Sequence, residues 1–146
     1  MSGFHETFGA VTIFVNAIAG ILGGIGWLTR KRVPGFWLTL RAGQALILVE
    51  AVTGAALLLD GKDLPRLHLI YGLVPIAVAF LAEQLRLLSA AQVLERHDLE
   101  DSQAVSTLPQ TEQHALVAEI LRRETGTMAA SALVITLLAL RAQGWL

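Results

Sequence analysis

The apolar residues of this chain are gathered into long blocks, whereas a soluble domain spreads its core positions among polar ones. Residues 7–29 contain no charged side chain, and this run of about 23 residues is long enough to cross a bilayer as a helix. Three further apolar blocks follow, each bounded by charged residues, glycine or proline. We therefore predict four membrane-spanning helices, at about 8–28, 36–59, 66–86 and 126–142.

Tryptophans and turn residues mark the ends of the first two predicted spans. Trp27 and Trp37 flank the basic turn at residues 30–32, as tryptophans do at a membrane interface. Gly61 ends the second span, since glycine accepts the left-handed conformation that commonly terminates a helix. The chain starts MSGFHETFGA, with no Lys or Arg, so we interpret the first span as retained and not as a cleaved signal.

The connection between the third and fourth predicted spans, residues 87–124, has a helical pattern of its own. Four apolar residues at helical spacing indicate that the third span continues past the membrane: Leu87, Leu88, Ala91 and Leu94. Residues 107–110 read TLPQ, which has the form of a capping box with an early proline. We expect a second helix from there to about residue 124, and thus an ordered helical extension.

Basic residues are distributed unequally between the two sides of the predicted bundle. The turn at 30–32 and the region from Arg86 to Arg123 contain seven, against three on the other side (Lys62, Arg66 and Arg141). The positive-inside rule then places residues 87–124 in the cytoplasm and both termini outside the cell (plasma) membrane.

Composition agrees with a membrane protein and excludes several kinds of chemistry. The chain is 54% hydrophobic and 16% charged, with a mean hydropathy of +0.60, whereas soluble domains carry about 25% charged residues. The absence of cysteine removes disulfides, iron–sulfur clusters and thiolate metal sites, and a net charge of −1 gives no reason to expect nucleic acid as a partner. We predict an all-α fold with a single domain (residues 1–146), an integral membrane four-helix bundle with a helical cytoplasmic extension.

Glu50 lies in the middle of the second predicted span. A charge near the bilayer centre costs about 2.5–3.5 kcal/mol even on insertion scales, so this side chain must face the bundle interior or stay protonated. Its helical neighbours Gly43, Thr53 and Gly54 are small, which suits a face packed against another helix. We therefore predict that Glu50 points inward.

Residues of the other spans supply partners for Glu50. The first span has a stripe of polar and small residues at steps of three or four: His5, Gly9, Thr12, Asn16, Gly20 and Gly24. By helix rise, Asn16 is expected at the depth of Glu50. His68 and Tyr71 share a face of the third span, nearer the outer surface, and Gln44 lies one to two turns from Glu50 on the inner side. We interpret Glu50, Asn16, His68, Tyr71 and Gln44 as a ligand or proton site; the alternative is a hydrogen-bonded cluster that fixes helix register.

The remaining charged and histidine side chains in this pattern have simpler interpretations. Arg41 either extends to the inner interface or forms an ion pair with Glu83, since both lie in the inner part of their spans. His97 and His114 fit no compact metal motif and are interpreted as solvated.

Three functions fit these features. We favour a binding or accessory protein of the membrane, with its polar site centred on Glu50, because no catalytic motif is present to indicate an enzyme. The first alternative is a proton-coupled transporter of a small solute or ion. It implies a homo-oligomer or a larger membrane complex, because four short spans form a small pathway alone.

The second alternative is a redox subunit that binds haem. Four-helix membrane cytochromes hold haem between histidines at matched depth, because the iron needs axial ligands. The candidates are His5 and His68, but His5 is predicted about 7–8 Å further out by helix rise. It would have to fold inward to become a ligand.

Overall fold

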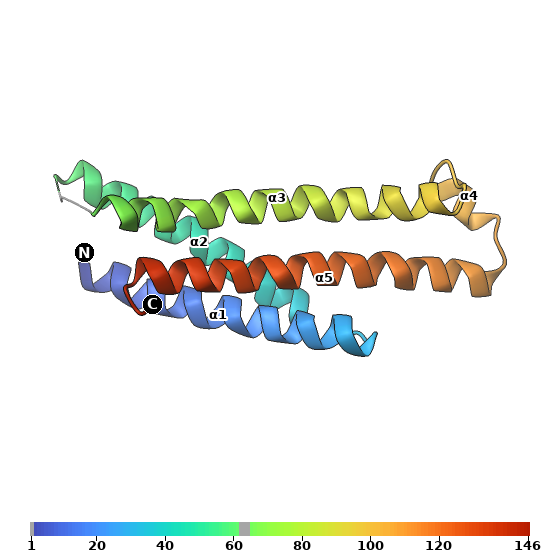
Figure 1. Cartoon of the computed structure of the whole chain (residues 1–146), viewed down its shortest axis with the longest axis horizontal. Helices are drawn as coiled ribbons and strands as arrows, with labels where there is room; N and C mark the ends of the chain where they lie inside the picture. Colours follow the sequence, from blue (N-terminus) through green and yellow to red (C-terminus); the bar gives the residue numbers. More distant parts are fainter. Residues whose placement is uncertain (1, 62–64) are drawn as a thin grey trace.

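The computed structural model describes residues 2–61 and 65–146, and within this part regular structure is helical throughout (Figure 1). Four helices are long: α1 (Ser2–Thr29), α2 (Phe36–Leu59), α3 (Arg66–Arg96) and α5 (Gln110–Ala142); α4 (Ser102–Ser106) is a single short helix. All four long helices are long and apolar enough to cross a membrane. The prediction of an all-helical chain with four candidate spans is confirmed.

Helix α5 is the central element of the bundle. It packs along α1 on one side and α3 on the other, while α2 packs mainly on α1 and makes few contacts with α3 or α5. Both termini lie at one end, which we call the terminal end (Figure 1). At the opposite end, α3 and α5 continue past the α1–α2 turn as a two-helix hairpin, residues 88–124, with α4 at its tip. The bundle is therefore least closed between α2 and α3.

The interior where the four helices meet is built from small and medium side chains. Its buried cluster contains Ala19, Phe36, Leu40, Ala82, Met128 and Ala132. A Cβ atom at Gly20 would lie 2.5 Å from Leu133 Cδ2, so this glycine permits the close approach of α1 and α5. Gly24 has nothing within 4 Å of a built Cβ, so only one glycine of the G-x-x-x-G pair makes a tight contact.

A tight turn joins α1 to α2. Arg30 adopts a left-handed conformation (φ 56°), and the Lys31 N–H donates to Gly26 O at 3.2 Å, which closes the helix end as a Schellman motif does. Gly35, also left-handed (φ 83°), precedes the first residue of α2.

The fourth span differs from its prediction in one respect. The helix expected to end near residue 124 and the span expected from 126 are one continuous helix, α5. Gly126 does not break it; its missing side chain makes room for Trp27, whose Cδ1 would lie 2.7 Å from a Cβ there. The predicted capping box is also not formed, because the Thr107 hydroxyl donates to Ala104 O at 2.7 Å and no side chain caps α5.

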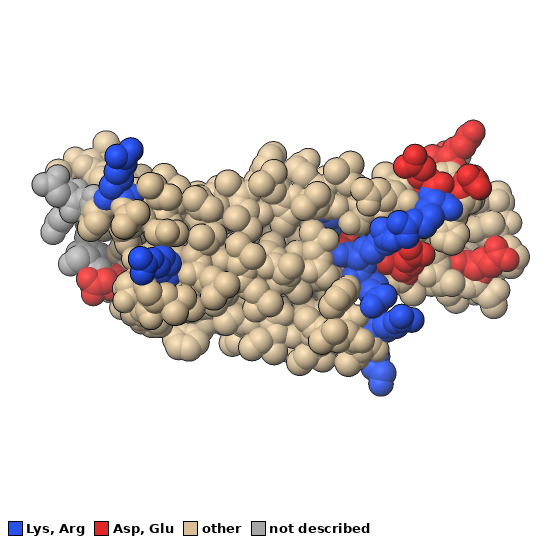
Figure 2. Space-filling view, viewed as in Figure 1, with Lys and Arg blue, Asp and Glu red and all other residues tan. Residues whose placement is uncertain are grey.

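Charged side chains are concentrated at the two ends of the molecule. Figure 2 shows acidic and basic side chains over the hairpin and a few at the terminal end, with a wide uncharged stretch between them on this face. An uncharged belt flanked by charges is the surface that a bilayer-spanning bundle presents.

Candidate functional site

Glu50 lines a cavity of about 200 Å³ in the half of the bundle nearest the termini. All four long helices contribute to it, and most of the lining is apolar or small: Gly9, Ile47, Ala51, Gly54, Ala55, Leu58, Leu69, Gly72, Leu73, Pro75, Ile135, Ala139 and Ala142. The cavity exists because α2 makes little contact with α3 here and because glycine and alanine leave the space unfilled. A mostly apolar cavity with a few polar groups is the usual form of a small-molecule site.

His5 is the direct partner of Glu50. Its Nδ1 lies 2.9 Å from Glu50 Oε2 and 3.2 Å from Thr53 Oγ1. Thr53 in turn donates to the backbone of α2 (Val49 O at 2.9 Å, Glu50 O at 3.0 Å), which leaves its oxygen free to accept from the imidazole. The side chains of His5 and Glu50 are only 13% and 16% exposed. This contact is therefore largely shielded from solvent.

The second oxygen of Glu50 has no partner among the described residues. Glu50 Oε1 is buried and makes no hydrogen bond with the described part of the chain. Leaving a buried carboxyl oxygen unsatisfied costs about 1–3 kcal/mol or more, and native structures rarely tolerate it without a reason. The atom belongs to a residue of the cavity wall, so a bound donor or cation would satisfy it.

His68 lies beside His5 in the same cavity. Its Nδ1 is 2.9 Å from the carbonyl oxygen of Ala142, and because a carbonyl only accepts, this nitrogen carries the hydrogen. The ring centroids of His5 and His68 are 5.7 Å apart, with the planes at 71°. The sequence placed His5 further out; in the structure α1 is shifted along its axis relative to α2 and α3, so that His5 contacts Glu50 and lies beside His68. Tyr71 lines the same cavity, as predicted.

Asn16 does not meet Glu50. It is completely buried, and its Nδ2 donates to Thr12 O at 2.9 Å and Gly43 O at 3.4 Å. Asn16 Oδ1 is a second buried oxygen without a partner among the described residues, close enough to α2 that a Cβ at Gly43 would lie 2.8 Å from it. Asn16 therefore joins α1 to α2 outside the cavity lining.

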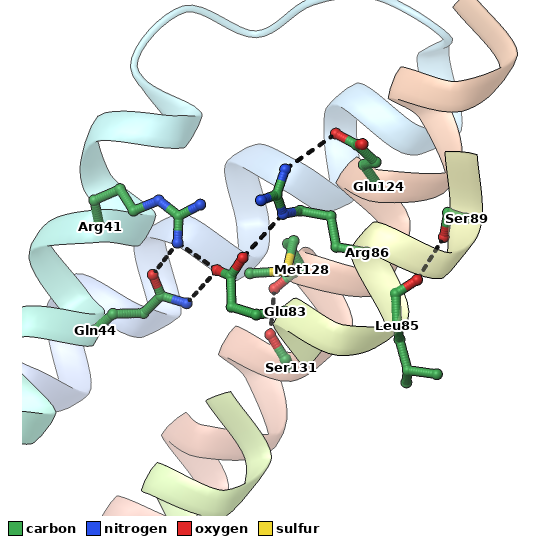
Figure 3. Close-up of polar contacts among 9 residues, drawn as sticks. All are labelled: Arg41, Gln44, Glu83, Leu85, Arg86, Ser89, Glu124, Met128 and Ser131. Atoms are coloured by element: carbon green, nitrogen blue, oxygen red, sulfur yellow. Dashed lines mark hydrogen bonds and ion pairs between the residues drawn. The ribbon is translucent and has the colours of Figure 1, made fainter. Parts of the chain in front are cut away.

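Gln44 belongs to a separate ion network nearer the hairpin (Figure 3). Its Nε2 donates to Glu83 Oε1 at 3.0 Å, and its Oε1 accepts from Arg41 at 2.6 Å. Arg41 pairs with Glu83, and Arg86 bridges Glu83 Oε2 (2.9 Å) to Glu124 (3.7 Å). The Arg41–Glu83 ion pair is confirmed, and the network ties α2, α3 and α5 together.

Helix α5 supplies site residues that the sequence did not indicate. Ala142 orients His68, and the Gln143 side chain fills the space over Gly9, where a Cβ would be 1.8 Å from its Nε2. In the sequence, Thr53 stands out only as a small helical neighbour of Glu50. A single sequence gives no indication that Gly9 packs against the side chain of Gln143, near the other terminus.

Within residues 2–61 and 65–146, no group of three or more His, Asp or Glu side chains is arranged to hold a metal ion. In comparisons with protein families, curated proteins and solved structures, the chain has no match to any of them.

Proposed function

We propose that this chain is a multi-pass membrane protein that binds a small ligand in the cavity around Glu50. Four apolar helices of sufficient length and an uncharged belt between charged ends support the membrane location. The observation that carries the ligand proposal is the unpartnered Oε1 of Glu50 in the wall of a mostly apolar cavity. Ionisable groups within membrane helices mark functional sites by default.

The cavity limits the ligand. Its volume of about 200 Å³ is below the roughly 300–1,000 Å³ of sites for drug-sized molecules. The polar group of the ligand has to donate a hydrogen bond or carry positive charge, because the atom it would meet is a carboxyl oxygen. A small amine or a compact molecule with one N–H or O–H group meets both requirements.

Mild purification tests this proposal. The protein is extracted in a gentle uncharged detergent, denatured, and the released small molecules are identified by mass spectrometry against a mock preparation. We expect a small molecule with a donor or cationic group at close to one per chain. Release of nothing beyond lipid and detergent, both from this sample and after incubation with small amines, would contradict the proposal.

One observation supports haem as a second candidate. Both His5 and His68 have their Nδ1 held, by a carboxylate and by a backbone carbonyl, and neither Nε2 hydrogen-bonds to a described residue. Metal-ligating histidines are oriented in this way by their other ring nitrogen. These Nε2 atoms are the ones that a bis-histidine haem would use, but a porphyrin needs more room than this cavity of about 200 Å³ offers. Visible absorbance of the purified protein tests whether it contains haem.

A further inference from the structure

Four cations near the α1–α2 turn have no acidic partner among the described residues. Arg41, Arg86, Arg96 and Arg123 each form an ion pair with a glutamate. By contrast, no carboxylate in the described chain pairs with the four cations of the turn region: Arg30, Lys31, Arg32 and Arg122. Four uncompensated positive charges in one place attract an anion.

These four cations surround a hollow. They line a cavity of about 660 Å³ between the α1–α2 turn and α5. Its apolar lining includes Leu22, Phe36, Trp37 and Leu121. The Phe36 and Trp37 rings lie 4.9 Å apart, and Phe36 is buried. The cavity therefore offers positive charge on one side and an apolar wall on the other.

Arg122 is held in place from α5. Its Nε donates to Trp27 O at 3.2 Å, and its guanidinium carbon lies 5.6 Å from the centre of the Trp27 ring. Stacking on an aromatic face leaves the terminal N–H groups of arginine available to an anion. Gly126 permits this arrangement, because any side chain there would meet Trp27.

We propose that this cavity binds the phosphate group of an anionic phospholipid. The phosphate contacts Arg30, Lys31, Arg32 and Arg122, and the lipid tails follow the apolar wall. The cavity is lined by residues at the end of α1, at the start of α2 and on α5. In Figure 1 the α1–α2 turn lies where α3 and α5 continue on as the hairpin. Basic pockets between helices at this level suit lipid head groups, and the aromatic wall favours a lipid over free phosphate. The inference rests on the proposed membrane location but not on the ligand cavity.

The test is titration of the detergent-purified protein with short-chain phosphatidylglycerol, phosphatidylcholine and inorganic phosphate, followed by native mass spectrometry. We expect saturable binding of phosphatidylglycerol, one per chain, and little binding of the other two. Arg122→Gln should weaken it about tenfold, because a charge-assisted hydrogen bond is lost. Arg122→Lys, which keeps the charge but loses the planar fork, should weaken it less. An unchanged melting temperature shows that each variant is folded.

Arg96→Gln is the matched control, since Arg96 is exposed, lies on the hairpin and does not line the cavity. It should change the affinity by less than about twofold, because no contact with the lipid is lost. An equal loss in Arg96→Gln and Arg122→Gln would show general charge attraction and overturn the proposal. So would binding of inorganic phosphate as tight as that of the lipid, or unchanged lipid binding in an Arg32→Gln/Arg122→Gln double variant. Release of the protein from membranes by alkaline carbonate would refute the membrane location separately, whatever the lipid titration gives.

Discussion

His5 Nδ1 lies 2.9 Å from Glu50 Oε2, and this contact joins the start of α1 to the middle of α2. Both side chains are mostly buried, and the contact satisfies one carboxyl oxygen of Glu50. The other oxygen, Oε1, makes no hydrogen bond with a described residue. The pair therefore leaves one buried acceptor for a bound donor or cation.

Glu50→Leu should destabilise the protein, because His5 loses the carboxyl group and keeps only its longer contact with Thr53 Oγ1. The expected loss is about 1.5–3 kcal/mol, as for a hydrogen bond to a charged group. Glu50→Gln keeps a polar partner for His5 and should unfold within a few degrees of wild type. Thermal unfolding of both variants in the same lipid nanodiscs measures the difference. Equal melting temperatures for the Glu50→Leu variant and the wild-type protein would mean that the contact contributes nothing to stability.

Gly43→Ala should disturb the crossing of α1 and α2. The new methyl group would lie 2.8 Å from Asn16 Oδ1, and overpacking at a buried contact costs about 1–3 kcal/mol. Gly24→Ala is the control: nothing lies within 4 Å of its built Cβ, so the better helix propensity of alanine should leave stability unchanged or raise it by up to about 1 kcal/mol. Unfolding of both variants under identical conditions is compared. Equal effects at the two positions would contradict the Asn16–Gly43 contact.

The orientation of the helices can be tested with reporters. Fusions after residues 32 and 105 should report the cytoplasm, and fusions after residues 62 and 146 should report the outside, because seven basic residues lie on one side and three on the other. A cytoplasmic signal after residue 146 alone would show that the fourth predicted span does not cross the membrane. A cytoplasmic signal after residue 62 would contradict the whole orientation.

The hairpin should be ordered in the intact protein. Val93 of α3 and Leu116 of α5 are buried although this part extends beyond α1 and α2, and Glu119 pairs with Arg96 and Arg123. We expect slow amide exchange through most of residues 90–122, with faster exchange near α4. Uniformly rapid exchange across this range would show that the two helices do not stay paired.

The helices themselves could be predicted from the sequence, because apolar runs of span length have few other interpretations. The Arg41–Glu83 pair was one of two alternatives that the sequence left open, since both residues lie at similar depth. The partner of Glu50 could not be predicted from the sequence. A start near residue 8 placed Asn16 level with Glu50, whereas α1 begins at Ser2 and Asn16 packs on Gly43. Gly43 lies seven residues from Glu50, or about 10 Å along the helix axis.

Helix rotation and crossing angle account for the other differences. Gln44 is close to Glu50 in sequence but faces Arg41 and Glu83, because residues six apart on a helix are turned well away from each other. Ala142 and Gln143 line the cavity only because of where α5 ends relative to α1 and α3. One sequence determines the spacing of residues along each helix but not how the helices are turned toward one another.

The central claim is that Glu50 binds a small molecule and is not only a structural contact. The most direct measurement is the content of co-purified small molecule per chain in wild type, Glu50→Gln and Glu6→Gln, each isolated identically in mild detergent. Glu6→Gln makes the same chemical change at an exposed position that does not line the cavity. We predict that Glu50→Gln is folded but loses at least about nine-tenths of the bound molecule, the loss of one charge-assisted bond, while Glu6→Gln retains it. Equal content in all three proteins would contradict the account and leave Glu50 as a structural residue.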